Sequence, residues 1–214
     1  MSGLFEKDLR IILKRKMTLV IFVILALGIG ISMGGVFIVG YLSLLLGILA
    51  IGTEAYDEMD DGFTFLMTMP VSAKTYVIEK YLFSGAGILC GWIIGVGISA
   101  ISPLFNPESD AFSFGAEQLA ILATMTCMMS IVLALQIKFG AEKSRVIYII
   151  LFGAVAAVVF FMVKVLPEER HAIMEAQLGN VSDGVVLVGA CILMLVSLLI
   201  CIPASIKAVK GKFN

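Results

Sequence analysis

The sequence predicts an all-α integral membrane protein with six transmembrane helices, an amphipathic helix at the N-terminus and a cytoplasmic helical segment between spans two and three. Hydrophobic residues fill 60% of the 214 positions and charged residues only 14%, whereas about one quarter of a soluble domain is charged. The charged residues are confined between long apolar runs, and a helix of ~20 apolar residues crosses about 30 Å of hydrocarbon. The basic residues fall on alternate connections, as expected of a membrane protein.

The N-terminal stretch MSGLFEKDLRIILKRK, residues 1–16, has the pattern of an amphipathic helix. Lys7, Arg10 and Lys14 are expected to face lipid head groups. An in-plane interfacial helix and a basic flank that only orients the first span both stay open. The KRK run does not indicate a nucleic-acid partner, because membrane flanks are routinely basic. The apolar stripe would consist of Leu4, Phe5, Leu9, Ile12 and Leu13.

The first two spans share the apolar run from Met17 to Gly52, which is too long for one helix. Glycines between positions 28 and 35 mark a tight reversal in its middle. The run continues without a polar cleavage region, so we interpret it as two retained helices rather than a signal peptide. The predicted spans are 17–31, 36–51, 82–101, 118–135, 146–163 and 184–204.

The basic residues predict the orientation. All but two of the 15 Lys and Arg residues, namely Lys164 and Arg170, lie on one side of the predicted spans. By the positive-inside rule this side is cytoplasmic, and both termini lie there. The outer connection at 167–180 is predicted to form a short surface helix, since Pro167 suits a first turn and Gly179 a stop. Short outer connections and a retained first span favour a bacterial cytoplasmic membrane.

No motif in the chain predicts catalysis, a cofactor or a metal site. FGAEKSR at 139–145 lacks the glycine loop of a P-loop, so ATP hydrolysis is not expected here. DEMDDG, beginning at Asp57, fails as an EF-hand because Met59 and Thr68 occupy ligand positions. The four cysteines lie in apolar runs and are interpreted as small apolar residues. They are Cys90, Cys127, Cys191 and Cys201.

The predicted spans are almost free of ionisable residues. Ion-coupled carriers usually place such groups inside the membrane, so the sequence disfavours a secondary carrier and an intramembrane hydrolase. The polar residues inside the spans are expected to form helix–helix hydrogen bonds. They are Ser43, Ser84, Ser99, Thr124, Thr126, Ser130 and Gln136.

Small residues recur at every fourth position of span three and therefore lie on one helix face. This spacing permits close approach of another helix backbone. The face could pack against another span of the same chain or form a subunit interface, and both interpretations stay open. Its residues are Gly87, Gly91, Gly95 and Ser99.

The connection between spans two and three is strongly acidic. Asp57 and Asp61 are like charges at i, i+4, which mildly destabilise a free helix and would be better accommodated against a basic surface. Aromatic and methionine residues lie among the carboxylates, as on protein-binding surfaces. A docking face and a solvated loop lying on the bilayer are the two interpretations. Pro70 breaks the chain and Ser72 can cap the next helix.

Several blocks resemble the ABC-2 type permease subunits of bacterial ABC transporters. These are KDLRIILKRK, MPVSAKTYVIEKYL (Met69–Leu82) and FGAEKSRVIYIILFG. The chain is most similar to the small six-span group that includes permeases of phenol-soluble-modulin exporters and peptide-antibiotic resistance systems. The sharpest block is PVSAKTYVIEKYL, preceded here by Met69 where the family usually has Leu. The resemblance covers nearly the whole chain, as a single domain over 1–214.

The resemblance implies a permease that exports amphipathic or hydrophobic compounds such as peptides. It implies a dimer with a second copy or a related permease, and separate cytoplasmic ATPase subunits. Residues 1–16 would be the interfacial elbow helix, and 53–81 the coupling segment, with a coupling helix from Glu54 to Leu66. The expected ATPase contacts are Glu54, Tyr56, Asp57, Glu58, Asp61 and Phe63. The alternative is a membrane-bound immunity or assembly protein that binds a partner without transport.

Overall fold

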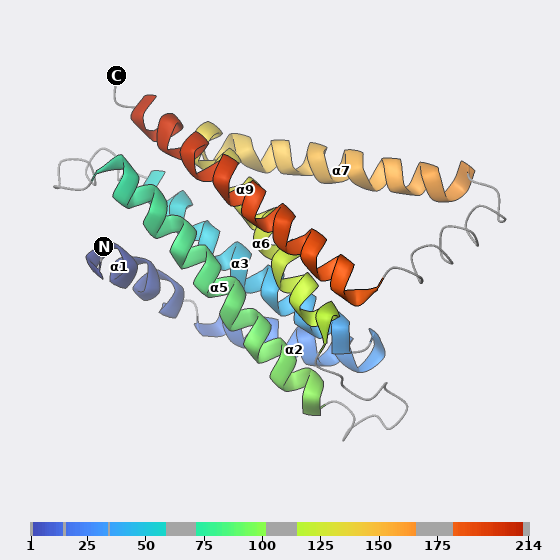
Figure 1. The fold of residues 1–214 in the computed structure, drawn as a ribbon. Coiled ribbons are helices and arrows are strands. Elements are labelled where there is room, and N and C mark those ends of the chain that lie inside the picture. Colours follow the sequence, from blue (N-terminus) through green and yellow to red (C-terminus); the bar gives the residue numbers. More distant parts are fainter. Residues whose placement is uncertain are drawn as a thin grey trace.

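The computed structural model describes residues 2–14, 16–33, 35–58, 72–101, 115–165 and 182–211. Every secondary-structure element in these ranges is a helix, which confirms the all-α class (Figure 1). The helices are α1 (Ser2–Leu13), α2 (Lys16–Met33), α3 (Gly35–Glu58), α5 (Ala73–Ile101), α6 (Ala116–Phe139), α7 (Ala141–Val165) and α9 (Asp183–Gly211).

Four of these helices are long and apolar enough to cross a membrane: Phe37–Asp57, Ala73–Ile101, Ala116–Phe139 and Gly184–Gly211. They contain the predicted second, third, fourth and sixth spans. The predicted first and fifth spans fall in α2 and α7, and some side chains of both helices lie outside the described set. Six spans therefore stay a prediction. The predicted surface helix at 167–180 lies outside the described residues.

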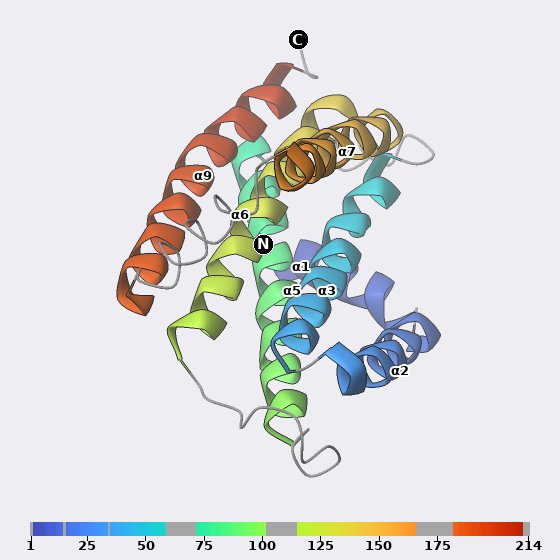
Figure 2. The ribbon, with the colours of Figure 1, turned by 90° about the vertical axis from the view of Figure 1, so that its right-hand side faces the viewer.

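Helices α3, α5, α6 and α9 run up and down between two ends of the molecule, whereas α7 lies at a large angle to them (Figures 1 and 2). α2 ends at Met33 and α3 begins at Gly35, so the chain turns inside the glycine-rich stretch. α3 packs on α5, and α6 packs on α9. Figure 2 shows α9 at one edge and α2 at the other, with α5 between them. Figure 1 shows α1 beside the start of α5, at the same end as the C-terminus. We call this end the α1 end.

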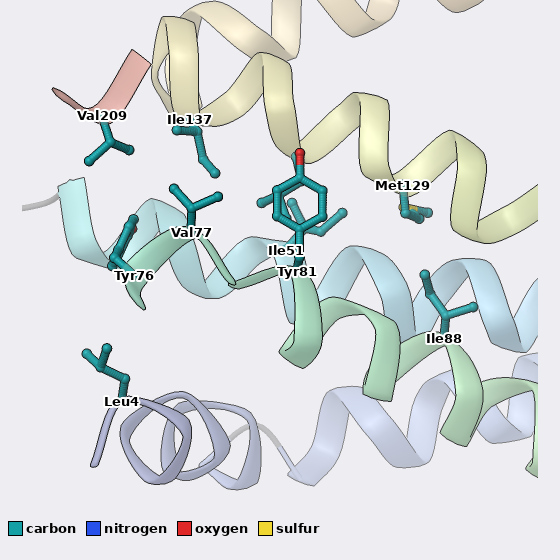
Figure 3. Close-up of a cluster of buried hydrophobic side chains, with 10 residues drawn as sticks. Leu4, Ile51, Tyr76, Val77, Tyr81, Ile88, Met129, Ile137 and Val209 are labelled. Carbon is teal, nitrogen blue, oxygen red and sulfur yellow. The ribbon is translucent and has the colours of Figure 1, made fainter. Parts of the chain in front are cut away.

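The main core lies among α3, α5, α6 and the last turns of α9, with Leu4 of α1 covering it at the α1 end (Figure 3). Val77, Tyr81 and Ile88 of α5 line the core at helical spacing. The outer face of α9 is instead exposed and apolar, with Leu193 and Leu199 at 64% and 73% exposure. Apolar exposure on this scale is typical of a surface that meets lipid.

The small-residue face of α5 packs against α3 of the same chain. A Cβ added to Gly91 would lie 2.8 Å from the Ser43 Cα, and one added to Gly95 would lie 2.7 Å from the Val39 Cα. A Cβ on Gly87 would meet the Ala50 side chain at 2.9 Å, and Ser99 is also buried. α3 therefore occupies this face, and a subunit interface would have to use another surface.

The serines and threonines predicted to join helices bond mainly to their own helix. The Ser43 hydroxyl donates to the Val39 carbonyl at 2.7 Å, and Thr124 and Thr126 donate to carbonyls four residues earlier. Ser130 does link two helices, because its hydroxyl donates to Ser197 of α9 at 3.1 Å.

Candidate functional site

The predicted coupling helix does not begin as a separate element at Glu54. Helix α3 continues without a break to Glu58, so Glu54, Tyr56 and Asp57 lie on its last turns. The helix that contains the predicted span two thus continues past Ile51, the predicted end of the span, to Glu58. The Glu58 side chain, Asp61 and Phe63 lie outside the described residues.

The last turns of α3 direct two of the expected contact residues into the protein. Glu54 and Asp57 are 3% and 4% exposed, and Thr53 is 1% exposed. Thr53 and Asp57 share a face because they are four residues apart. Tyr56, three residues after Thr53, is 38% exposed. In this structure Tyr56 is accessible to a partner, whereas Asp57 is engaged inside the chain.

Asp57 belongs to a buried ion-pair network that joins three helices. Lys80 of α5 lies between Asp8 of α1 and Asp57 of α3; its Nζ donates to Asp8 and lies 2.8 Å from Asp57 Oδ2. Lys7 of α1 pairs with the other oxygen of Asp57 and lies 3.3 Å from Asp8 Oδ1. We call Lys7, Asp8, Asp57 and Lys80 the α1 clamp.

Neutral side chains complete the α1 clamp. The Tyr76 hydroxyl donates to Asp57 Oδ2 at 3.2 Å, and the Thr53 hydroxyl lies 3.0 Å from Asp8 Oδ2. Lys80 also lies over the Tyr76 ring, 5.6 Å from its centroid. Buried charges are tolerated when they are paired and further hydrogen-bonded, and removing one partner from such a pair is strongly destabilising.

The α1 clamp lies in an acidic environment. Glu54 and Glu79 add two buried carboxyl groups to the balanced charges of the clamp, and Glu79 is 2% exposed. Within the described residues neither Glu79 oxygen has a hydrogen-bond partner. The last turns of α3 and the first turns of α5 are therefore rich in carboxyl groups even below the surface.

Helix α1 packs on the bundle through Leu4 and Asp8, both buried, while Leu9 and Leu13 are 42% and 48% exposed. The Phe5 ring meets Phe83 edge-on, with centroids 5.0 Å apart. The expectation that Lys7 faces head groups is wrong in this structure, because Lys7 pairs with Asp57. The interfacial position of α1 stays a prediction, supported by the exposed leucines.

The sequence analysis did not single out Asp8 or Lys80. One signal for Asp8 was available: it stands four residues after Leu4 and four before Ile12, so it interrupts the apolar stripe. A carboxylate on the packing face of a helix indicates a buried partner. The identity of that partner requires tertiary contacts, since Lys80 lies 72 positions further along the chain.

The described residues contain no group of three or more His, Cys, Asp or Glu side chains arranged to hold a metal ion. All four cysteines are free, and Cys90 is exposed. The ion pairs at the α1 end join α1, α3 and α5.

A second feature is a partly open cavity of about 810 Å³ lined by α3, α6 and α7. It extends from the middle of α3 to the α1 end. Most of its lining is apolar, and the polar groups lie at the α1 end. The residues that line it are Leu44, Ile48, Ile51, Gly52, Ala55, Tyr56, Met128, Met129, Val132, Gln136, Ala141, Arg145 and Tyr148.

Long apolar helices with exposed apolar faces define a helical membrane protein. Comparison with protein-family profiles matches residues 3–210 to the ABC-2 family transporter protein family. The chain belongs to this family and is a membrane component of a transporter, which confirms the resemblance seen in the sequence. Searches of curated proteins and of solved structures found no significant match.

Proposed function

We propose that the chain is the permease subunit of an ABC exporter in a bacterial cytoplasmic membrane, driven by a separate ATPase subunit. Six spans and a second permease copy or a related permease would form the pathway. The cargo would be amphipathic or hydrophobic compounds such as peptides. Membership of the ABC-2 transporter family supports the assignment as a permease subunit. The α1 clamp is the observation on which the proposed coupling to the ATPase rests.

The α1 end would face the cytoplasm. Lys14, Lys74 and Lys210 lie at this end of α1, α5 and α9 and are all exposed. Basic residues next to spans favour the cytoplasmic side. Both chain ends and the acidic connection after α3 would then be within reach of a cytoplasmic ATPase.

The ATPase would dock on the acidic connection that follows α3. The exposed Tyr56, with Glu58, Asp61 and Phe63 beyond it, would supply the contacts. Glu54 and Asp57 would act from beneath this surface, because their burial and the ion pairs of Asp57 hold the last turn of α3 in place. Of the six expected contact residues, four would therefore touch the ATPase, and Glu54 and Asp57 would support them from below.

The α1 clamp gives a physical route for coupling. ATP binding moves the ATPase subunits. This motion shifts the permease between its two states only if the ATP-bound ATPase binds one state more tightly than the other. α3 reaches from the docking connection through its apolar span as one helix of 24 residues. Because Asp57 is tied to α1 and α5, displacement of the α3 terminus would move three helices together.

Co-purification with a candidate ATPase subunit, such as one encoded by a neighbouring gene, tests the docking proposal. We expect Glu58→Lys with Asp61→Lys to abolish co-purification, since like charges across an interface cost several kcal/mol, or about a thousandfold in affinity. The matched control is Glu142→Lys, an exposed charge reversal at the start of α7. Membrane insertion of all variants is measured in parallel. Unchanged co-purification of the double variant would remove the docking connection from the proposal.

A further inference from the structure

The cavity among α3, α6 and α7 has the dimensions and lining of a small-molecule site. Its volume of about 810 Å³ falls within the range of about 300–1,000 Å³ of ligand pockets, which are mostly apolar with a few placed polar groups. Leu44, Ile48 and Met128 form its apolar part, halfway along their helices. An apolar chain could therefore lie parallel to α3.

The polar groups of the cavity gather at the α1 end. Gln136 is buried, and the Tyr148 hydroxyl donates to the Val132 carbonyl at 2.6 Å and lies 3.5 Å from Gln136 Oε1. The bond to Val132 holds Tyr148 of α7 against α6, and the Tyr148 side chain lines the cavity. Because the Tyr148 hydroxyl already donates to the Val132 carbonyl, Tyr148 contributes its ring to the shape of the cavity and no hydrogen-bond donor for a ligand.

Arg145 supplies the charge at the mouth. It is exposed, and among the described residues no carboxylate lies within ion-pair distance of it. It lies one turn into α7, whose first backbone N–H groups carry a partial positive charge. Lys138, in the last turn of α6, and Lys143, in the first turn of α7, are also exposed. A guanidinium over an apolar cavity attracts a ligand with an anionic group at one end.

We propose that this cavity binds an amphiphile with an apolar chain and an anionic head group, entering from the leaflet beside the α1 end. The head group would meet Arg145, and the chain would lie against Leu44, Ile48 and Met128. Basic pockets between membrane helices on the cytoplasmic side hold anionic head groups in the same manner. The inference deepens the proposed function by naming a cargo class, and its leaflet assignment rests on the proposed orientation.

The test measures binding to the purified chain alone, in nanodiscs of zwitterionic lipid, without the ATPase. The probe is a C16 alkyl phosphate with a diazirine in its chain, used for photolabelling and peptide mapping. We expect saturable labelling of α3 near Leu44–Ile48 and of α6 near Met128–Val132. Unlabelled alkyl phosphate should compete at least tenfold better than the phosphocholine of equal chain length.

Two charge-neutralising variants make the test specific. Arg145→Gln should weaken labelling about tenfold, as expected for loss of a charge-assisted contact, whereas Lys143→Gln, two positions earlier and outside the cavity lining, should leave labelling unchanged. Equal competition by phosphate and phosphocholine, labelling spread over the outer face of α9, or equal effects of the two variants would each overturn the proposal. Because no ATPase is present, these failures are separate from a failure of ATPase co-purification.

Discussion

Replacing Lys80 with methionine is expected to lower the free energy of unfolding by about 3–5 kcal/mol. The ammonium group lies between Asp8 and Asp57, which are 0% and 4% exposed. Without it, two buried carboxylates face each other with Lys7 alone to compensate. Equilibrium unfolding of the purified protein in mixed micelles measures the loss. Lys74→Met is the matched control, because Lys74 is exposed on the same helix and its loss should change stability by less than about 0.5 kcal/mol.

A second substitution checks that charge, rather than lost volume, causes this effect. Asp8→Asn introduced with Lys80→Met should recover part of the stability, because one uncompensated charge is removed; residues of one network are expected to be coupled in this way. If Lys80→Met is no more damaging than Lys74→Met, the α1 clamp does not hold α1 to the bundle.

Replacing Gly91 with alanine is expected to cost about 1–3 kcal/mol, because the new methyl group would lie 2.8 Å from the Ser43 Cα and would force α3 and α5 apart. Unfolding is measured as for Lys80. Gly97→Ala is the control on the same helix, since a Cβ there meets nothing within 4 Å. That control should be neutral or stabilising by up to ~1 kcal/mol, the difference in helix propensity.

The same pair of variants separates the two interpretations of the small-residue face. If Gly91→Ala leaves unfolding unchanged and instead reduces cross-linking between subunits, this face is a subunit interface and the packing of α3 on α5 is wrong.

Features set by local sequence were predictable. The turn between α2 and α3 follows from the clustered glycines, and the apolar parts of α3 and α5 follow from apolar runs. The extension of α3 beyond Ile51 was missed because polar residues from Thr53 onward were taken as a change of element. Thr53 and Asp57 are polar because they bond to buried side chains of α1 and α5, and such contacts between helices cannot be inferred from the local sequence.

The α1 clamp and the cavity required the structure for a related reason. Lys7 and Asp57 are 50 positions apart and belong to segments whose charges individually suggested membrane flanks and a docking surface. The cavity is lined from three helices, and no one of them carries a recognisable ligand motif. Pairing over such separations depends on how helices pack, which the period of apolar residues does not specify.

The proposed orientation is tested most directly by cysteine labelling in intact cells. In a background with the native cysteines replaced, Lys74→Cys places a single exposed thiol in the first turn of α5, and Ser182→Cys places one just before α9, at the opposite end of the molecule. A membrane-impermeant maleimide should label Ser182→Cys in intact cells and Lys74→Cys only after lysis. Labelling of Lys74→Cys in intact cells would put the α1 end outside the cell, away from ATP, and would contradict coupling to a cytoplasmic ATPase.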